Sequence, residues 1–240
     1  TTTVIWTVTD IYGNQSTCSM TVTVTDDEDP SITCPPDISV SNDANQCSAV
    51  VNVPSPVVND NCTVQSVVND YTGTANASGV YPVGTTTVTW TVTDIYGNSS
   101  QCSMTVTVVD DEAPEITCPA DITSGTDQDL CEAFVTVPAI ALSDECGIAS
   151  VVNDFTGTSN ASGIYPLGTT LVTWTVTDIY GNSSVCSMSV TILDDQDPYI
   201  TCPADQFVSA DSNCEFTMDD YIPLVIASDN CDADLDFVQS

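Results

Sequence analysis

Apolar and polar residues alternate strictly along several short stretches of the chain. In TTTVTWTVTD (85–94), Val88, Trp90 and Val92 fall on one face, and threonines fall on the other. The stretch CSMTVTVVD (102–110) continues the same alternation with cysteine, methionine and valine on one face. A period of two residues is typical of a β-strand that buries one face. Both stretches are therefore predicted to be half-buried strands.

Shorter stretches extend this pattern and show where the strands turn. CSAVVNV (47–53) and TVQSVVND (63–70) predict two further strands. The segment IYGNSSQ (95–101) predicts a hairpin turn, because Gly97 can adopt a positive φ and either Asp94 or Asn98 can hydrogen-bond local backbone. No stretch shows the period of a helix. About seven short strands in each unit indicate an all-β protein made of tandem immunoglobulin-like antiparallel β-sandwiches.

An internal repeat of 84 residues organises the chain. The nonapeptide WTVTDIYGN occurs unchanged at 6–14, 90–98 and 174–182. The period predicts two full repeats, flanked by the last two strands of one unit and the first part of another, with boundaries at 1–25, 26–109, 110–193 and 194–240. Either the chain is a window on a longer repeat protein, or separate chains complete one another by strand donation. Both alternatives give a fibre.

The charge composition excludes several classes of function. The chain has 34 acidic residues and no Lys, Arg or His. It therefore has no histidine for general acid–base catalysis, no lysine for a Schiff base, and no cation to bind the phosphates of nucleic acid. A hydrolase with paired carboxylates is chemically conceivable, but identical small repeats are a poor setting for one. No apolar run approaches the ~18 residues of a membrane span, so no membrane insertion is expected in this segment.

Trypsin is expected to leave the chain intact, even after reduction and unfolding, because no Lys or Arg is present. Mass spectrometry after prolonged digestion would give the undigested mass. Fragments produced by a trypsin preparation free of other proteases would contradict the sequence as written.

The twelve cysteines recur with nearly the period of the repeat, at 18, 102 and 186; 34, 118 and 202; 47, 131 and 214; and 62, 146 and 231. Zinc sites normally use histidine or closely spaced cysteine pairs, and neither is present. Disulfides in an oxidising environment are the better interpretation. The expected location is therefore secreted: extracellular, on a cell surface or in a matrix.

Four stretches together resemble the HYR (hyalin repeat) module: DEDPSITCPPDISV (27–40), CSAVVNVPSPVVNDNC (47–62), YPVGTTTVTWTVTDIYGN (81–98) and CSMTVTV (102–108). The resemblance covers essentially the whole chain. It implies an immunoglobulin-like extracellular domain, found in animal matrix proteins and in very long surface or adhesin proteins of bacteria, notably Bacteroidota. It implies no enzymatic activity, so the chain is not expected to be an enzyme.

The resemblance also implies a disulfide pattern. The first and last cysteines of a unit form the most regular pair of the family, which implies Cys34–Cys102 and Cys118–Cys186. The remaining cysteines would then pair as Cys47–Cys62, Cys131–Cys146 and Cys214–Cys231. Cys18 and Cys202 would have partners outside this segment. A bridge from Cys102 to Cys118 is not expected, because the strand that begins at Cys102 spans ~26 Å, whereas bridged Cα atoms lie within ~7 Å.

Acidic residues gather in three features of each unit: the opening cluster (DDEDP, DDEAP or DDQDP), the loop DNC or DEC, and the turn DIYGN. In an immunoglobulin-like sandwich these features lie at one end, at the junction with the preceding unit. Calcium binds six to eight oxygens, so a junction calcium site is one hypothesis. Its candidate ligands are Asp26, Asp27, Asp29, Asp60, Asp94, Asp110, Asp111, Glu112, Asp144, Asp178, Asp194, Asp195, Asp197 and Asp229. The alternative is a solvated acidic linker, with Ile95 and Tyr96 packing on the neighbouring unit.

The favoured function is a structural and adhesive extracellular protein that forms an extended stalk or filament at a cell surface or in a matrix. Its expected partners are neighbouring repeats or identical chains in a fibre, with a surface glycan or protein as a further ligand. The alternatives are a carbohydrate- or protein-binding module and the spacer region of a secreted hydrolase. Near-identical repeats favour the stalk, and the absence of Arg and Lys disfavours a ligand site that depends on them.

Overall fold

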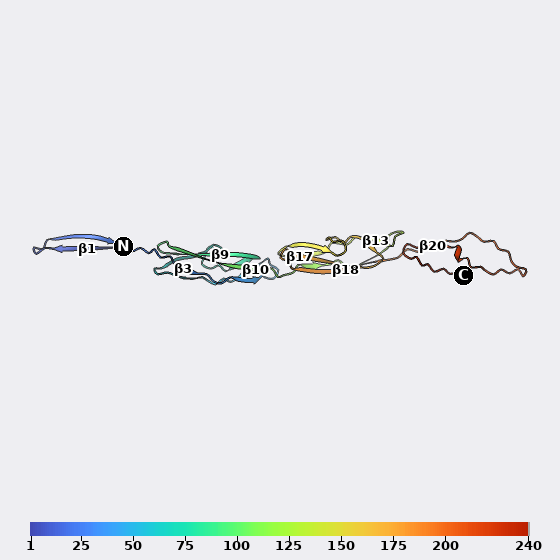
Figure 1. Ribbon diagram of the computed structural model, residues 1–240, viewed down its shortest axis with the longest axis horizontal. Coiled ribbons are helices and arrows are strands. Elements are labelled where there is room, and N and C mark those ends of the chain that lie inside the picture. The colour runs from blue at the N-terminus through green and yellow to red at the C-terminus, as the bar shows by residue number, and fades with distance from the viewer. Residues whose placement is uncertain (240) are drawn as a thin grey trace. The chain divides into compact units, whose positions relative to one another are not determined.

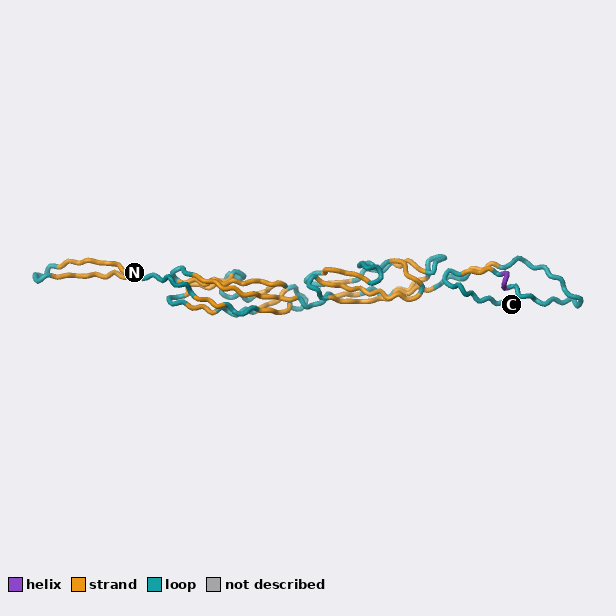
Figure 2. The backbone as a smooth tube through the Cα atoms, in the orientation of Figure 1, coloured by secondary structure: helices purple, strands orange, loops and turns teal. Residues whose placement is uncertain are grey.

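The computed structural model describes residues 1–239, and its regular structure is almost entirely β-strand (Figures 1 and 2). The one helix of this part is a short 3-10 turn, Ile222–Leu224. Among the described residues, none lies in a helix long and apolar enough to cross a membrane. The chain divides into two compact units, Thr1–Asp111 and Glu112–Ser240. The all-β fold class predicted from the alternating pattern is confirmed.

The first full repeat contains a four-stranded sheet and two shorter strand pairs. In the four-stranded sheet, only the outer strand β4 runs parallel to its neighbour. Its order is β4 (Ile38–Ser41), β10 (Ser99–Val109), β9 (Gly84–Asp94) and β7 (Val64–Asn69). The shorter pairs are β3 (Ser31–Thr33) with β6 (Val57–Asn59), and β5 (Ser48–Val51) with β8 (Gly79–Pro82).

The core of this repeat lies on the face of β9 and β10 that the alternation marks as apolar. Trp90 is completely buried, and its indole N–H donates a hydrogen bond to the carbonyl of Ala75 at 3.1 Å. Tyr81 is also completely buried, and its hydroxyl donates to the carbonyl of Ala77 at 2.7 Å. Large aromatic groups are stable in a core when their polar atoms are bonded in this way.

The second full repeat reproduces this arrangement. Trp174 and Tyr165 take the core positions, and the indole of Trp174 donates to the carbonyl of Ser159 at 3.0 Å. The four-stranded sheet has the order β12 (Ile122–Gly125), β18 (Ser183–Leu193), β17 (Gly168–Asp178) and β15 (Ile148–Asn153). The shorter pairs are β11 (Glu115–Thr117) with β14 (Ala141–Ser143), and β13 (Glu132–Val135) with β16 (Gly163–Pro166).

The two end segments contain only part of this fold. At the start of the chain, β1 (Thr2–Thr9) and β2 (Gln15–Val22) form a hairpin that places Trp6 opposite Cys18. The equivalent strands β9 and β10 place Trp90 opposite Cys102 in the same register. At the other end, β19 (Tyr199–Thr201) pairs with β20 (Ile226–Ser228), and residues 202–221 form no strand (Figure 2).

Candidate metal site and repeat junction

The turn of the repeated nonapeptide is built around its aspartate. Oδ1 of Asp94 accepts hydrogen bonds from the backbone N–H groups of residues 96–98, at 2.6–2.8 Å. Its Oδ2 accepts a further hydrogen bond from the side-chain amide of Asn98 at 2.8 Å. Gly97 supplies the positive φ of 97° that this turn requires. Asp178 makes the same set of hydrogen bonds in the second full repeat.

Three aspartates from separate segments meet at this turn. Asp26 lies in the segment before β3, Asp60 follows β6, and Asp94 ends β9. One carboxylate oxygen from each lies within 4.8 Å of the other two. The side-chain amide of Asn98 also donates to the carbonyl of Asp26 at 3.2 Å, which holds the opening segment against the turn. Asp94 is fully buried, and the other two aspartates are half-buried.

Two oxygens of this cluster are buried without a hydrogen-bond donor: Oδ2 of Asp26 and Oδ1 of Asp60. The second oxygen of Asp60 is satisfied, because it accepts the backbone N–H groups of Cys62 and Thr63 at 2.9 and 2.7 Å. A buried carboxylate oxygen without a partner is costly. Calcium lies 2.3–2.6 Å from its ligands, so two oxygens on one ion are at most about 5.2 Å apart. The oxygen set therefore fits a single hard cation.

The electrostatics of the cluster follow from its uncompensated negative charge. A side-chain hydrogen bond to Asp26, with smaller effects of burial and of nearby carboxylates, raises the pKa of the Cys62 thiol to about 11. Burial by itself would raise the pKa of Asp94, but hydrogen bonds from Asn98 and the turn backbone outweigh it and lower the pKa. Folding thus favours the ionised carboxylate. Its stabilising contribution is present above the ordinary pKa of 3.8 and is lost as the pH falls through the lowered value.

The other candidate ligands have different environments. Asp27 and Asp29 are exposed and lie outside the three-aspartate cluster, although they adjoin Asp26 in sequence. Asp111 accepts a hydrogen bond from the hydroxyl of Ser41 at 2.6 Å. Asp110 is buried and Glu112 is half-buried.

In the second full repeat, the 84-residue period makes Asp110, Asp144 and Asp178 the equivalents of the first cluster. Asp144 accepts the backbone N–H groups of Cys146 and Gly147 at 2.9 and 2.6 Å, much as Asp60 does.

In the last segment, Asp194 and Asp229 hold equivalent positions. Asp229 accepts the N–H groups of Cys231 and Asp232, each at 2.8 Å. Asp195 lies directly against Gly125, and Asp197 is exposed. The turn chemistry at the fourth cysteine of each repeat is therefore shared by all three copies.

Eight of the twelve cysteines are disulfide-bonded. Within the full repeats, Cys34 is joined to Cys102 and Cys118 to Cys186, each with Cα atoms 5.7 Å apart. These two bridges tie the segment after the first strand of a repeat to its last strand. They are the pairs that the family resemblance implies.

Three of the pairs expected within a repeat are wrong: Cys47–Cys62, Cys131–Cys146 and Cys214–Cys231. Cys131 is joined instead to Cys231, with Cα atoms 4.8 Å apart. Cys47 and Cys146 are disulfide-bonded, whereas Cys62 and Cys214 are free.

The strand arrangement within a repeat explains why its third and fourth cysteines do not pair. Residue 42, in the turn that leads to Cys47, donates its backbone N–H to the carbonyl of Val109, at the end of β10. Cys62 lies at the opposite end, where the carbonyl of Thr63 accepts the N–H of Ile95. The 11 residues of β10 span about 35 Å at ~3.3 Å each. The third and fourth cysteines of one repeat are therefore much too far apart to form a bridge, which requires Cα atoms within ~7 Å.

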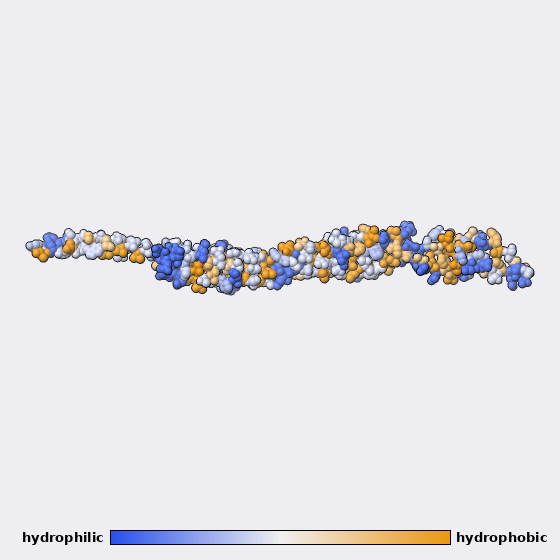
Figure 3. Space-filling view, in the orientation of Figure 1, coloured by the Kyte–Doolittle hydropathy of each residue, from blue (hydrophilic) through white to orange (hydrophobic). Residues whose placement is uncertain are grey.

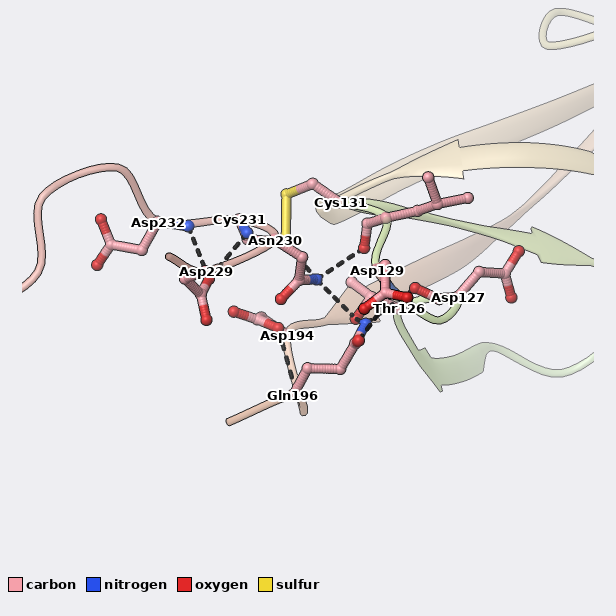
Figure 4. Close-up of a disulfide and its surroundings, with 11 residues drawn as sticks. Thr126, Asp127, Asp129, Cys131, Asp194, Gln196, Asp229, Asn230, Cys231 and Asp232 are labelled. Atoms are coloured by element: carbon pink, nitrogen blue, oxygen red, sulfur yellow. Dashed lines mark hydrogen bonds between the residues drawn. A yellow bond between two sulfur atoms is a disulfide. The ribbon is translucent and has the colours of Figure 1, made fainter. Parts of the chain in front are cut away.

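The bridge Cys131–Cys231 joins the second full repeat to the segment that follows it (Figure 4). The side chain of Gln196 adds three hydrogen bonds, each of 2.9 Å: it donates to the hydroxyl of Thr126 and the carbonyl of Asp127, and accepts the N–H of Asp129. The amide of Asn230 donates to the carbonyl of Leu130 at 2.7 Å. The sequence prediction missed this junction. Its signal was present in the third and fourth cysteines, which recur in every repeat but lie at opposite ends of it.

The HYR domain family model matches residues 25–108 and 109–192. These two matches cover more than half of the chain, which therefore belongs to the HYR domain family. The two full repeats described above thus correspond to two HYR domains in tandem.

Relatives with similar sequences occur in sea urchins and mammals. Hyalin from Strongylocentrotus purpuratus is 31% identical over 216 residues, which cover 85% of this chain and 17% of that protein. Hyalin from Lytechinus variegatus is 29% identical, with 87% and 40% covered. The rat sushi, von Willebrand factor type A, EGF and pentraxin domain-containing protein 1 is 28% identical, with 85% and 6% covered. The chain thus spans less than half the length of each relative. None of the three is bacterial, so the resemblance to surface proteins of Bacteroidota is not supported by them.

Two solved structures show a more distant similarity. Drosophila N-cadherin EC1-4 matches with a TM-score of 0.35 and 14% identity, covering 75% of this chain and 52% of that one. Human protocadherin-24 EC1-2 matches with a TM-score of 0.33 and 16% identity, covering 70% and 99%.

Proposed function

We propose that the chain is part of a non-catalytic, extracellular structural and adhesive protein whose HYR repeats form a stalk or filament. The observation that carries this proposal is the junction between consecutive repeats. A disulfide and the hydrogen bonds of Gln196 and Asn230 fix one repeat to the next. A series of units joined in this way transmits force along the chain, which is what a stalk requires.

The chemistry of the surface supports the same role. The chain has no basic side chain and no histidine, so the described surface offers neither a general base of ordinary pKa near neutrality nor a cation for an anionic substrate. Disulfides at this density suit an oxidising, extracellular location. The junction supports neighbouring repeats as the partners of each unit.

Small-angle X-ray scattering of the oxidised chain tests the stalk. We expect an elongated particle with a single, well-defined maximum dimension. Opening the junction by C131S/C231S should broaden the distribution of dimensions, because only the main chain and hydrogen bonds would then hold the last segment to the second full repeat. A compact particle in the oxidised state, or an unchanged profile in the variant, would contradict the proposal.

We further propose that Asp26, Asp60 and Asp94 hold a calcium ion. The support lies in the two buried oxygens without a donor, in the separation of 4.8 Å that suits one ion, and in a chain without a single basic residue. A bound calcium supplies two positive charges at a point where three carboxylates otherwise repel. It would also fix the opening segment of the repeat to the DIYGN turn. Water and carbonyl oxygens would complete its coordination.

Isothermal titration calorimetry is expected to show that Asp26 contributes to calcium binding and that its neighbour Asp27 does not. D26N removes one charge from the cluster and should weaken calcium binding at this site by at least about tenfold, because a charged ligand is lost. D27N is the matched control, since Asp27 is exposed and lies outside the cluster, and its binding should stay near wild type. Equal weakening by D26N and D27N would show that only the general acidity of the segment matters.

Magnesium should substitute poorly at this site, because it requires tighter octahedral geometry and loses water reluctantly. Calcium removal should leave the far-ultraviolet circular dichroism nearly unchanged, since disulfides already stabilise the cores. Scattering profiles that superimpose with calcium and with chelator, together with no heat of binding, would refute the calcium proposal. The acidic cluster that opens each repeat would then be only a solvated linker.

A further inference from the structure

Six triplets of the form Asn-x-Ser or Asn-x-Thr, with x other than proline, occur in the chain. This triplet is the acceptor signal for N-linked glycans in secreted proteins. Its asparagines are Asn14, Asn61, Asn76, Asn98, Asn160 and Asn182. Two positions recur at the 84-residue period, one at 76 and 160 and the other at 98 and 182. The structure gives these two positions opposite environments.

The asparagines of the DIYGN turn are used by the fold. The Nδ2 group of Asn98 donates to Oδ2 of Asp94 at 2.8 Å and to the carbonyl of Asp26 at 3.2 Å. These two bonds occupy both hydrogens of the amide, and the residue is half-buried. Asn182 is also half-buried, and its Nδ2 donates to Oδ2 of Asp178 at 2.8 Å. A glycan on Nδ2 would replace a hydrogen that the turn needs.

Asn76 lies in the loop between β7 and β8, and its side chain has a different role. Its Oδ1 accepts the backbone N–H of Ser78 at 2.9 Å, which forms an Asx turn. The side chain is exposed, and its Nδ2 donates no hydrogen bond to any residue that the structure describes. The acceptor nitrogen therefore faces solvent, and the loop does not depend on its hydrogens.

The core holds the backbone on both sides of Asn76. The carbonyl of Ala75 accepts the indole N–H of Trp90, and the carbonyl of Ala77 accepts the hydroxyl of Tyr81. The carbonyl of Asn76 itself accepts two threonine hydroxyls of the loop, at 2.7 and 3.0 Å. The asparagine thus projects from a loop that is fixed by bonds in which its Nδ2 takes no part.

Asn160 has the same environment in the second full repeat. Its Oδ1 accepts the backbone N–H of Ser162 at 2.9 Å, and the carbonyl of Ala161 accepts the hydroxyl of Tyr165 at 2.7 Å. The side chain is exposed, and within the described part of the chain its Nδ2 donates no hydrogen bond. Two independent copies of the loop therefore present the same acceptor.

The two other triplets also use the amide nitrogen of their asparagine. Asn14 donates to Oδ2 of Asp10 at 2.7 Å, and Asn61 donates to Oε2 of Glu28 at 2.8 Å. Among the six, only the asparagines at 76 and 160 keep Nδ2 without a hydrogen bond to a described residue.

We propose that Asn76 and Asn160 each carry an N-linked glycan, whereas Asn98 and Asn182 stay unmodified in the folded chain. The donor is an oligosaccharide carried on a lipid diphosphate. Nδ2 forms a bond to C1 of the first sugar, the bond from C1 to the diphosphate oxygen breaks, and one Nδ2 proton leaves. The relatives in sea urchins and mammals are animal proteins, and the animal secretory route supplies this donor.

The fold selects between the sites because the transfer acts on chains that have not finished folding. A chain modified at Asn76 loses no hydrogen bond of the loop, so it can reach the structure described above. A chain modified at Asn98 must break a bond to Asp94 or to Asp26 and must place a bulky glycan at a half-buried position. Such chains are expected to be depleted from secreted material.

An exposed apolar pair lies on the strands next to each proposed site. Val50 lies opposite Val80 in the pair β5–β8, and Phe134 lies opposite Ile164 in the pair β13–β16. All four side chains are more than half exposed, and hydrophobic residues are visible on the surface of both full repeats (Figure 3). β8 and β16 each begin three residues after the asparagine. A hydrophilic glycan there covers apolar surface that otherwise favours aggregation.

The test is secretion of the 240-residue chain from cultured mammalian cells behind a secretion leader, followed by peptide-N-glycosidase in heavy-oxygen water. The enzyme converts each glycosylated asparagine to an aspartate that carries the heavy oxygen. After reduction and alkylation, a protease that cuts after aromatic residues gives peptides that begin at residues 72, 97, 156 and 181, with one triplet in each. We expect the label in the peptides from 72 and 156 and not in those from 97 and 181.

Matched variants test the two kinds of site separately. N76D keeps the oxygen that accepts the N–H of Ser78 and removes the acceptor nitrogen, so the secreted chain should lose the mass of one glycan. S100A keeps the side chain of Asn98 and removes only the hydroxyl of its triplet. Its secreted mass should differ from wild type by the lost oxygen alone. Intact-mass spectrometry measures both.

A wild-type chain secreted with the mass of the bare polypeptide would overturn the proposal. Equal label at Asn98 and Asn76 would also overturn it, as would the loss of a glycan mass in S100A, because the fold would then not select between the sites. The proposal goes beyond the stalk proposed above and rests on it only for an extracellular location. None of these measurements depends on the scattering profile, so failure of the glycan sites can be distinguished from failure of the proposed function.

Discussion

Removing the Cys34–Cys102 bridge by C34S/C102S is expected to lower the free energy of unfolding of the first full repeat by about 4 kcal/mol. The bridged cysteines are separated by 68 residues in sequence. In the chain-entropy model, closing a loop of this size strongly reduces the conformational entropy of the unfolded chain. Small sandwiches have thin cores and a net stability of only about 5–15 kcal/mol, so this loss is a large share of the total. Urea denaturation followed by circular dichroism measures it.

Cys18 provides the matched control for this experiment. It holds the position of Cys102 in the repeat, opposite a tryptophan, but it is free and exposed. C18S should therefore change the stability of the monomeric chain by less than about 0.5 kcal/mol. A C34S/C102S chain as stable as C18S would show that the bridge does not stabilise the repeat.

Trp90→Ala is expected to destabilise the first full repeat by about 3–5 kcal/mol. The side chain is 0% exposed, so its loss leaves a cavity, and the carbonyl of Ala75 loses its donor. Trp6 lies in the identical nonapeptide but is 49% exposed in the hairpin. Trp6→Ala should change the stability of the monomeric chain by no more than about 0.5 kcal/mol.

Thermal or urea unfolding of the two variants measures the effect of the same substitution in the same nonapeptide. The tryptophan is buried in one case and half-exposed in the other. A similar loss in both variants would mean that the nonapeptide contributes through local strand preference. It would contradict the packing described for the core. The two variants should also keep the turn intact, since Asp10 and Asp94 accept the backbone N–H groups of the turn in each case.

The strands and the core could be predicted from the sequence because a half-buried strand must alternate. The alternation at 85–94 directs Val88, Trp90 and Val92 to one face, and all three are completely buried. The turn could be predicted as well, because few residue types other than glycine tolerate the φ of 97° at Gly97. The sequence offered both Asp94 and Asn98 to bond the turn backbone, and the structure shows that Asp94 does so. Local chemistry determines both features.

The junction bridge could not be predicted in the same way. Cysteine spacing along the chain does not reveal at which end of a sandwich each cysteine lies. The 15 residues from Cys47 to Cys62 are long enough to run the length of the repeat, and they do so. A short separation in sequence therefore gives a long separation in space, and Cys131 is joined to Cys231 of the following segment instead of to Cys146.

The candidate metal site was predictable as a region but not residue by residue. The opening cluster, the loop after β6 and the DIYGN turn were each identified as acidic, and Asp26, Asp60 and Asp94 come one from each. Sequence alone could not separate Asp26 from Asp27 and Asp29. Neighbouring residues in an extended segment point in different directions, and the contact of Asn98 with the carbonyl of Asp26 sets which one faces the turn.

A covalent bridge joins the second full repeat to the segment that follows it, and disulfide mapping of the oxidised chain tests this junction. Mass spectrometry of a digest prepared without reduction identifies the partner of Cys131. The structure predicts a peptide that joins Cys131 to Cys231. A peptide that joins Cys131 to Cys146 would contradict this junction, because both cysteines would then be used within a single repeat and no covalent bond except the main chain would link it to the next segment.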